Sequence, residues 1–179
     1  MGEALIVTGP PGAGKSTLAA LLVAHFEPSA LVAGDVFFAF LERGAIAPWL
    51  PEAHAQNEVV TKAAAACTGA LAAGGVTVVY DGVIGPWFLP DFAAAAGLAT
   101  LHYAVLLPTV EQCLERVATR QGHGFTDQEA ARQMHAEFSN ADLPARHLVD
   151  SREGPDQVVS AILSRMSEGT LLHRQSADR

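Results

Sequence analysis

Short apolar stretches alternate along this chain with longer stretches in which apolar residues recur every three or four positions. The short stretches end at glycine, proline or aspartate and predict buried strands at 3–8, 30–33, 76–80, 98–107 and 146–150. The longer stretches predict helices at 16–26, 52–73, 109–121, 126–138 and 155–166. Strands that alternate with helices are typical of a parallel sheet covered on both faces. The pattern therefore predicts an α/β protein.

The helix starts carry a recurring signal. Thr109 is followed three residues later by Gln112, and Thr126 is followed at the same spacing by Glu129. This spacing is that of a capping box, in which the two side chains bond each other's backbone N–H groups. We therefore expect Thr109 and Thr126 to begin helices.

Length and composition favour one domain. The chain has 179 residues, half of them hydrophobic, which is enough for one α/β core and too short for two. No repeat or linker is visible, so residues 1–166 are expected to form a single domain, with 167–179 as a flexible polar tail. The net charge of −8 argues against binding to nucleic acid or to an anionic membrane surface.

The two cysteines, Cys67 and Cys113, fall in predicted helices without a CxxC partner. They are expected to be buried free thiols, as in a reducing compartment. The start of the chain has no secretory pattern, and no apolar run reaches the roughly 18 residues that span a bilayer. We therefore expect a cytoplasmic protein without membrane contact.

One motif carries most of the predicted chemistry. Residues 9–17 fit G-x-x-x-x-G-K-[ST] and lie between the first predicted strand and the first predicted helix. Its glycines let the backbone direct N–H groups at phosphate oxygens, and the helix adds its positive N-terminal end. The alternative, a chance glycine-rich turn, would not require a strand and a helix around it. The motif predicts binding of a nucleoside triphosphate and Mg²⁺ by Gly9, Pro10, Pro11, Gly12, Ala13, Gly14, Lys15, Ser16 and Thr17, with Lys15 on the β- and γ-phosphates and Ser16 on the metal.

Two aspartates follow predicted strands. Asp35 comes after the strand at 30–33, and Asp81 after the strand at 76–80. Carboxylates at the carboxyl ends of parallel strands face the ligand crevice. Asp35 could orient an acceptor hydroxyl and accept its proton, or only cap the following helix. Asp81 could hold Mg²⁺, directly or through water or Ser16, or only close an Asp-Gly turn. We favour the functional role for both.

With these positions placed, the chain resembles the P-loop small-molecule kinases, such as gluconate kinase, shikimate kinase, chloramphenicol phosphotransferase, the zeta-toxin kinases and the tunicamycin-resistance ATP-binding proteins. Three features besides the phosphate loop carry the resemblance. Gly34-Asp35 matches the acidic position that faces the acceptor in several of these kinases. The stretch 116–125 resembles the R-x-x-x-R-x-x-H-F lid of gluconate kinase, with one extra residue before the phenylalanine. Gly154-Pro155 stands where such folds line the adenine pocket.

The resemblance implies a three-layer fold with a five-stranded parallel sheet in the order 2-3-1-4-5 and a short lid at about 120–138. It also implies that Asp35 is a catalytic residue together with Lys15, and that Pro155 contacts the nucleotide.

Arg116 and Arg120 are four residues apart, hence on one face of a predicted helix. A lid arginine would bring positive charge to the transferring phosphate, so both are candidate nucleotide contacts and Arg120 the candidate catalytic arginine. The alternative is an exposed pair bonded to neighbouring glutamates. Arg132 is a weaker candidate. His123 could contact phosphate or substrate, but a lone loop histidine is more often incidental.

The acceptor pocket is expected from residues 35–60 and from the loop after the strand at 76–80. Both segments are rich in aromatic residues and poor in positive charge. An anionic acceptor needs several cations, whereas apolar walls suit a neutral, partly hydrophobic alcohol. The alternative is that most of these aromatics belong to the core. The candidate substrate contacts are Asp35, Phe38, Arg43, Trp49, Gln56, Asn57 and Trp87.

The favoured prediction is a kinase that moves the γ-phosphate of ATP to a hydroxyl of such a molecule, for example an antibiotic or a nucleoside. One alternative is an ATP-binding resistance protein that sequesters its ligand without turnover. Another is a nucleotide switch acting on a protein partner, although no [NT]-K-x-D guanine motif is present. The chain is expected to act as a monomer or homodimer.

Overall fold

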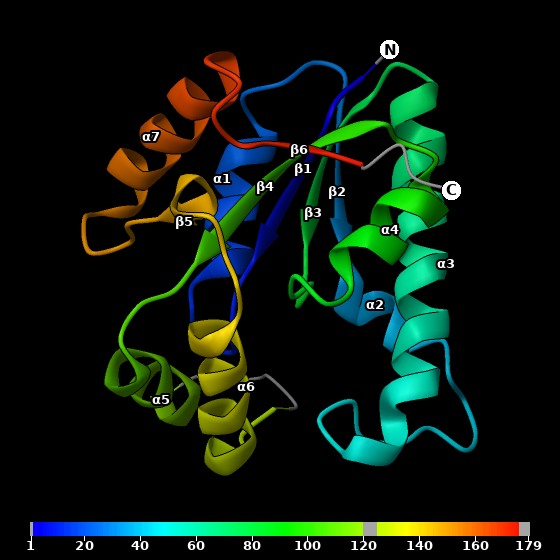
Figure 1. The fold of residues 1–179 in the computed structure, drawn as a ribbon, viewed down its shortest axis with the longest axis vertical. Helices are drawn as coiled ribbons and strands as arrows, with labels where there is room; N and C mark the ends of the chain where they lie inside the picture. The colour runs from blue at the N-terminus through cyan, green and yellow to red at the C-terminus, as the bar shows by residue number, and fades with distance from the viewer. Residues whose placement is uncertain (1, 120–124, 176–179) are drawn as a thin grey trace.

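A parallel sheet lies between two layers of helices in the computed structural model, which describes residues 2–119 and 125–175 (Figure 1). The five parallel strands run in the order β2-β3-β1-β4-β5, which confirms the expected three-layer fold and strand order. Their bounds are β1 (Ala4–Thr8), β2 (Ser29–Ala33), β3 (Thr77–Asp81), β4 (Thr100–Leu106) and β5 (Leu148–Val149).

A sixth strand, β6 (Leu172–Arg174), pairs antiparallel with β4. The prediction of a flexible polar tail from residue 167 is wrong over 167–175. Leu171 is completely buried, and its carbonyl accepts a hydrogen bond from the Tyr103 N–H at 2.9 Å. A three-residue strand has too few positions to show a period of two, which is why the pattern missed it.

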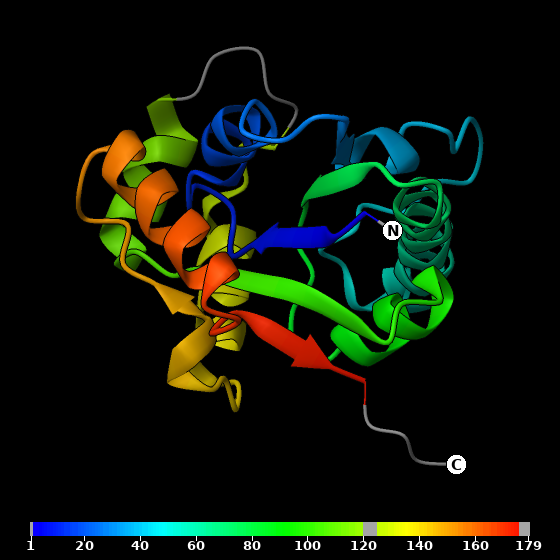
Figure 2. The same ribbon diagram turned by 90° about the horizontal axis from the view of Figure 1, so that it is seen from above.

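Helices α1 (Lys15–Val23) and α7 (Pro155–Ser167) cover one face of the sheet, and α3 (His54–Ala73) and α4 (Leu89–Ala96) cover the other (Figure 2). Successive residues of a strand point to opposite faces. In β1, Leu5 and Val7 therefore pack with α1 and α7, whereas Ile6 packs with α3 and α4. Both faces are apolar, which is why β1 reads as a continuous hydrophobic run.

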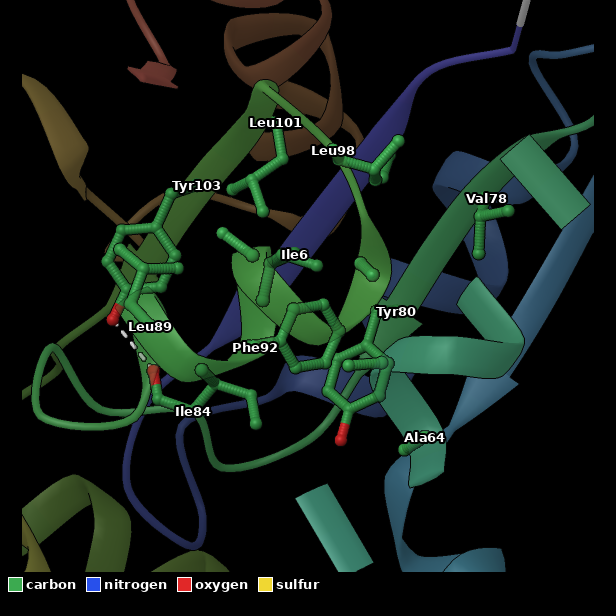
Figure 3. Packing of buried hydrophobic residues seen from close by; sticks show 14 of the residues in the cluster. Ile6, Ala64, Val78, Tyr80, Ile84, Leu89, Phe92, Leu98, Leu101 and Tyr103 are labelled. Atoms are coloured by element: carbon green, nitrogen blue, oxygen red, sulfur yellow. Dashed lines mark hydrogen bonds between the residues drawn. The ribbon is translucent and has the colours of Figure 1, made fainter. Parts of the chain in front are cut away.

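The core under α3 and α4 is dense in aromatic rings (Figure 3). The Tyr80 and Phe92 rings meet edge to face, with centroids 4.8 Å apart. Gly69 of α3 lies against the end of α4. A methyl group at Gly69 would overlap the Ala96 carbonyl, so only glycine allows this approach. This close approach packs the two helices tightly.

Three further helices lie toward the carboxyl ends of the parallel strands, where Figure 1 shows α5 and α6 on one side and α2 beside α3 on the other. They are α2 (Gly34–Phe38), α5 (Val110–Thr119) and α6 (Gln128–Asn140), and two short 3-10 turns occupy Pro51–Ala53 and Ala145–His147. The sequence missed α4 and did not resolve α2 as an element, because both are shorter than the window in which helical periodicity shows.

The capping predictions had different outcomes. The Thr109–Gln112 box is confirmed, since each side chain bonds the other's backbone N–H, at 3.2 and 3.3 Å. The predicted cap at Thr126 is wrong: Asp127 caps α6, and its carboxylate accepts a hydrogen bond from the Ala130 N–H at 3.0 Å. Aspartate is a good N-cap in its own right, and here it displaces the start of the helix by one residue.

Both cysteines are free, as predicted. Cys113 is buried and Cys67 half-buried, and burial raises the pKa of the Cys113 thiol. In the ranges 2–119 and 125–175, no helix has the length and apolar character needed to cross a bilayer.

Candidate functional site

The phosphate loop connects β1 to α1 at the centre of the sheet. Gly9, Gly12 and Gly14 all have positive φ angles, of 144°, 79° and 96°. At Gly9 a side chain would overlap the Leu106 carbonyl of β4, and at Gly12 it would overlap the Cys113 carbonyl of α5. The loop therefore needs glycine both for its backbone angles and for its contacts with the neighbouring elements.

Lys15 and Arg116 bring positive charge to this loop. The Lys15 ammonium donates to the Pro10 carbonyl at 3.0 Å. Arg116 reaches back from α5, and its Nη1 donates to the carbonyls of Gly12 and Ala13 at 3.2 and 3.4 Å. A pocket of about 260 Å³ lies at this point, lined by Gly12, Gly14, Lys15, Ser16, Thr17, Arg116 and Thr119. Lys15 and Arg116 thus lie beside the same pocket at the phosphate loop.

A second, larger cavity adjoins the loop. It has a volume of about 550 Å³ and is walled by the loop, the carboxyl ends of β2 and β3, α2, α3 and α6. Its lining includes Lys15 and most of the residues predicted for the metal and the acceptor: Ser16, Asp35, Phe38, Trp49, Asn57, Asp81 and Trp87. Parallel strands bring these side chains together because β2 and β3 end at the same edge of the sheet.

Pairs of aromatic rings connect the two sides of this acceptor cavity. Trp49, in the segment before α3, meets Phe125 with ring centroids 4.9 Å apart. Trp87, in the loop after β3, meets Phe138 of α6 at 5.3 Å. His54 stacks on Phe88 at 5.6 Å. The predicted tryptophans therefore form an apolar rim, and Trp87 remains 43% exposed.

The loop after β3 is held by a small hydrogen-bond network. Thr8 donates to the Ile84 carbonyl at 3.0 Å and accepts from the Ile84 N–H at 2.8 Å. The Tyr103 hydroxyl donates to the same carbonyl at 2.7 Å. These bonds fix the loop to β1 and β4, and with it the position of Trp87.

Several predicted residues lie elsewhere. Gln56 bonds the backbone N–H and carbonyl of Ile46, both at 2.8 Å, so it holds the segment before α3 rather than lining the cavity. Arg43 is exposed and outside the lining. Pro155 begins α7 and lines neither pocket. Arg132 is exposed and lies 3.9 Å from Glu129.

Two further predicted residues, Arg120 and His123, lie outside the described residues, as does part of the predicted lid at 120–138. Of that segment, the structure describes Phe125 and α6. His135 of α6 contacts the Pro108 carbonyl at 2.8 Å, which attaches the helix to the end of β4.

Tyr80 and four residues of α6 line the cavity although the sequence did not predict them there: Ala130, Gln133, Met134 and Glu137. Tyr80 was counted within a buried strand, and its position directly before Asp81 was the available signal. The α6 residues share a helical spacing, but only the packing of α6 turns that face toward the phosphate loop.

The charges around the acceptor cavity are mostly negative. Among the described residues that line it, Lys15 is the one lysine or arginine, whereas Asp35, Asp81 and Glu137 are carboxylates. Because Lys15 belongs to the phosphate loop, the described lining offers no further lysine or arginine to pair with an anionic acceptor.

The oxygen atoms that Mg²⁺ would need are present. Mg²⁺ prefers oxygen ligands and usually binds one or two protein groups together with substrate phosphates. Ser16 and Asp81 line the same cavity beside the loop, and both offer oxygen. No group of three or more His, Cys, Asp or Glu side chains within the described ranges could hold a metal by itself. The residues therefore fit an ion shared with the nucleotide.

Comparison with known proteins agrees with this geometry. Residues 5–137 match the AAA domain family. No curated protein matches the sequence.

Solved structures share the fold at low sequence identity. A sugar kinase from Janibacter sp. HTCC2649 superposes with a TM-score of 0.69 at 20% identity, covering 93% of this chain and 95% of that one. The tunicamycin resistance protein of Deinococcus radiodurans gives 0.67 at 16%, covering 93% and 96%. Shikimate kinase from Acinetobacter baumannii gives 0.61 at 17%, covering 96% of each chain. Together with the phosphate loop and the strand order, these matches show that the chain belongs to the AAA domain family and has the fold of the P-loop small-molecule kinases.

Proposed function

We propose that this protein transfers the γ-phosphate of ATP to a hydroxyl of a partly hydrophobic small molecule that carries no anionic group. One observation carries the proposal: a cavity of about 550 Å³ is lined both by Lys15 and Ser16 of the phosphate loop and by Asp35. An acceptor in this cavity would lie beside the phosphate to be transferred. Its volume is in the range of small-molecule sites, and the aromatic rim suits an apolar body.

Each of the site residues has its own role in phosphoryl transfer. Lys15 and Arg116 neutralise phosphate charge. Ser16 and Asp81 would hold Mg²⁺, which would add positive charge against the phosphates. The acceptor oxygen forms a bond to the γ-phosphorus as the bond to the β–γ bridging oxygen breaks. Asp35 takes the proton of the acceptor hydroxyl, so the products are a phosphate ester, ADP and one proton. Arg120 is proposed from the sequence to stabilise the charge of the transferring group.

The test begins with mass spectrometry, searching for a +80 Da product with ATP, Mg²⁺ and a library of hydroxylated metabolites and antibiotics. Asp35→Asn keeps the size of the side chain but cannot accept a proton. General-base catalysis contributes about 10²–10⁴-fold, so this variant should lose at least about a hundredfold in turnover while its ATP affinity is unchanged.

Asp156→Asn is the matched control, because Asp156 is an exposed aspartate in the first turn of α7, as Asp35 is in the first turn of α2. It should retain full activity. A fully active Asp35→Asn would remove Asp35 from the mechanism. A wild-type protein that binds an antibiotic tightly and never modifies it would instead support the sequestering function.

A further inference from the structure

The side chain of Tyr80 in β3 is confined between the two segments that carry the candidate aspartates Asp35 and Asp81. Figure 3 shows its hydroxyl pointing away from Val78 and past Phe92. A methyl group on Gly34 would overlap this hydroxyl, and one on Gly82 would lie 2.9 Å from it. Gly34 directly precedes Asp35, and Gly82 directly follows Asp81. The phenol therefore fits between the two short segments that carry the aspartates.

The Tyr80 hydroxyl has no hydrogen-bond partner among the residues that the structure describes, although the side chain is only 3% exposed. The other tyrosine, Tyr103, is equally buried, and its hydroxyl donates to the Ile84 carbonyl. Within the described ranges, the completely buried side-chain polar atoms that lack a partner belong to Asn57, His102 and His147, so the Tyr80 hydroxyl is not completely enclosed. Because Tyr80 lines the acceptor cavity, a molecule bound there can supply the missing partner.

The chemistry around Tyr80 defines that partner. A phenol has an ordinary pKa near 10, so the Tyr80 hydroxyl carries its proton at neutral pH and can donate it. Ionised carboxylates only accept hydrogen bonds. Within this corner of the cavity, Tyr80 is therefore the donor and the aspartates are the acceptors. The group that Tyr80 binds should be an oxygen with a free lone pair.

We propose that Tyr80 binds a second oxygen of the acceptor, next to the hydroxyl that is phosphorylated. This inference rests on the proposed function, in which Asp35 receives the proton of the reacting hydroxyl. The reacting oxygen must keep a lone pair directed at phosphorus, so the Tyr80 hydrogen belongs on a neighbouring oxygen. The favoured acceptors are thus neutral, partly apolar molecules with two adjacent oxygens, such as vicinal diols.

Binding of a matched pair of probes tests this proposal without requiring turnover. Styrene glycol carries two adjacent hydroxyls on an aromatic body, and phenethyl alcohol lacks the second one. Trp49 and Trp87 are the two tryptophans of the chain and both line the cavity, so intrinsic fluorescence reports on binding there. Titrations would be made with ADP and Mg²⁺ present, on the wild type, Tyr80→Phe and Tyr103→Phe.

The wild type should bind styrene glycol about two- to tenfold more tightly than phenethyl alcohol, the range expected for one additional uncharged hydrogen bond. In Tyr80→Phe this preference should disappear, so that the two probes bind with about equal affinity. Tyr103→Phe should keep it, because Ile84 retains its bond from Thr8. Gly34→Ala, which displaces the Tyr80 hydroxyl, should reduce it as well and provides a second variant if Tyr80→Phe does not fold.

Equal binding of the two probes by the wild type, or a full preference in Tyr80→Phe, would overturn the role of Tyr80. Absence of binding for both probes would overturn it too, together with the assignment of the cavity to partly hydrophobic alcohols. A protein that shows the Tyr80-dependent preference but transfers no phosphate to any acceptor would contradict the proposed function alone.

Discussion

Replacing Lys15 by methionine should weaken ATP binding about tenfold or more. Methionine keeps an unbranched apolar stem of similar length and removes only the ammonium. A hydrogen bond to a charged group is worth about 1.5–3 kcal/mol, and each 1.4 kcal/mol corresponds to tenfold in affinity. The loss is therefore about 10- to 150-fold. Without nucleotide, the Lys15 ammonium already donates to the Pro10 carbonyl at 3.0 Å. Binding exchanges that bond for a phosphate contact, so the lower end of the range is expected.

Isothermal titration calorimetry with ATP and with ADP, in Mg²⁺, measures this effect. Both nucleotides should bind more weakly, because Lys15 is expected to contact the β-phosphate as well as the γ-phosphate. Lys62→Met is the matched control: Lys62 is the other lysine of the chain, is exposed, and pairs with Glu58 outside both pockets. It should bind both nucleotides like the wild type. A change below about threefold in Lys15→Met would refute the assignment of the loop as the phosphate site.

Arg116→Ala should weaken ATP binding by about three- to twentyfold with little change in melting temperature, because the guanidinium is exposed and its bonds to described residues go to two loop carbonyls. An unaltered dissociation constant would contradict this role. Burial lowers the pKa of His147 below its ordinary 6.5, so the unfolded chain takes up a proton at higher pH than the folded one. The contribution of neutral His147 to the free energy of unfolding should thus be fully present above about pH 6.5 and be lost as the pH falls below that value. Melting curves of His147→Leu should show a weaker pH dependence. Leu171→Ala should reduce the free energy of unfolding by about 2–5 kcal/mol, against less than about 1 kcal/mol for the half-exposed Leu148→Ala; equal effects in urea denaturation would argue against burial of the segment before β6.

Local patterns predicted the framework of this protein well. The runs around Ile6 and Val78 are apolar on both sides because both faces of the sheet are covered, and such runs are recognisable without a structure. The phosphate loop was equally clear, since its function depends on backbone angles that glycine alone adopts easily and on a lysine at a fixed spacing. The Thr109–Gln112 cap is also a local interaction, and it formed as predicted.

The composition of the acceptor cavity was only partly predictable. Strand ends identified Asp35 and Asp81, because the topology of a parallel sheet brings such positions to one edge. Gln56 and Asn57 looked equivalent in the sequence. A rotation of about 100° per residue around α3 separates them, so Gln56 bonds Ile46 while Asn57 lines the cavity.

The sequence by itself thus determined the five parallel strands, the phosphate loop and the acidic strand ends, because each depends on neighbouring residues. Tertiary structure alone decided which distant surfaces meet. It placed α6 across the cavity from Asp35, put β6 on the edge of β4, and set the Tyr80 hydroxyl between Gly34 and Gly82. These contacts join residues far apart in the chain, and they depend on packing shape and buried area, for which no short stretch of sequence carries a signal.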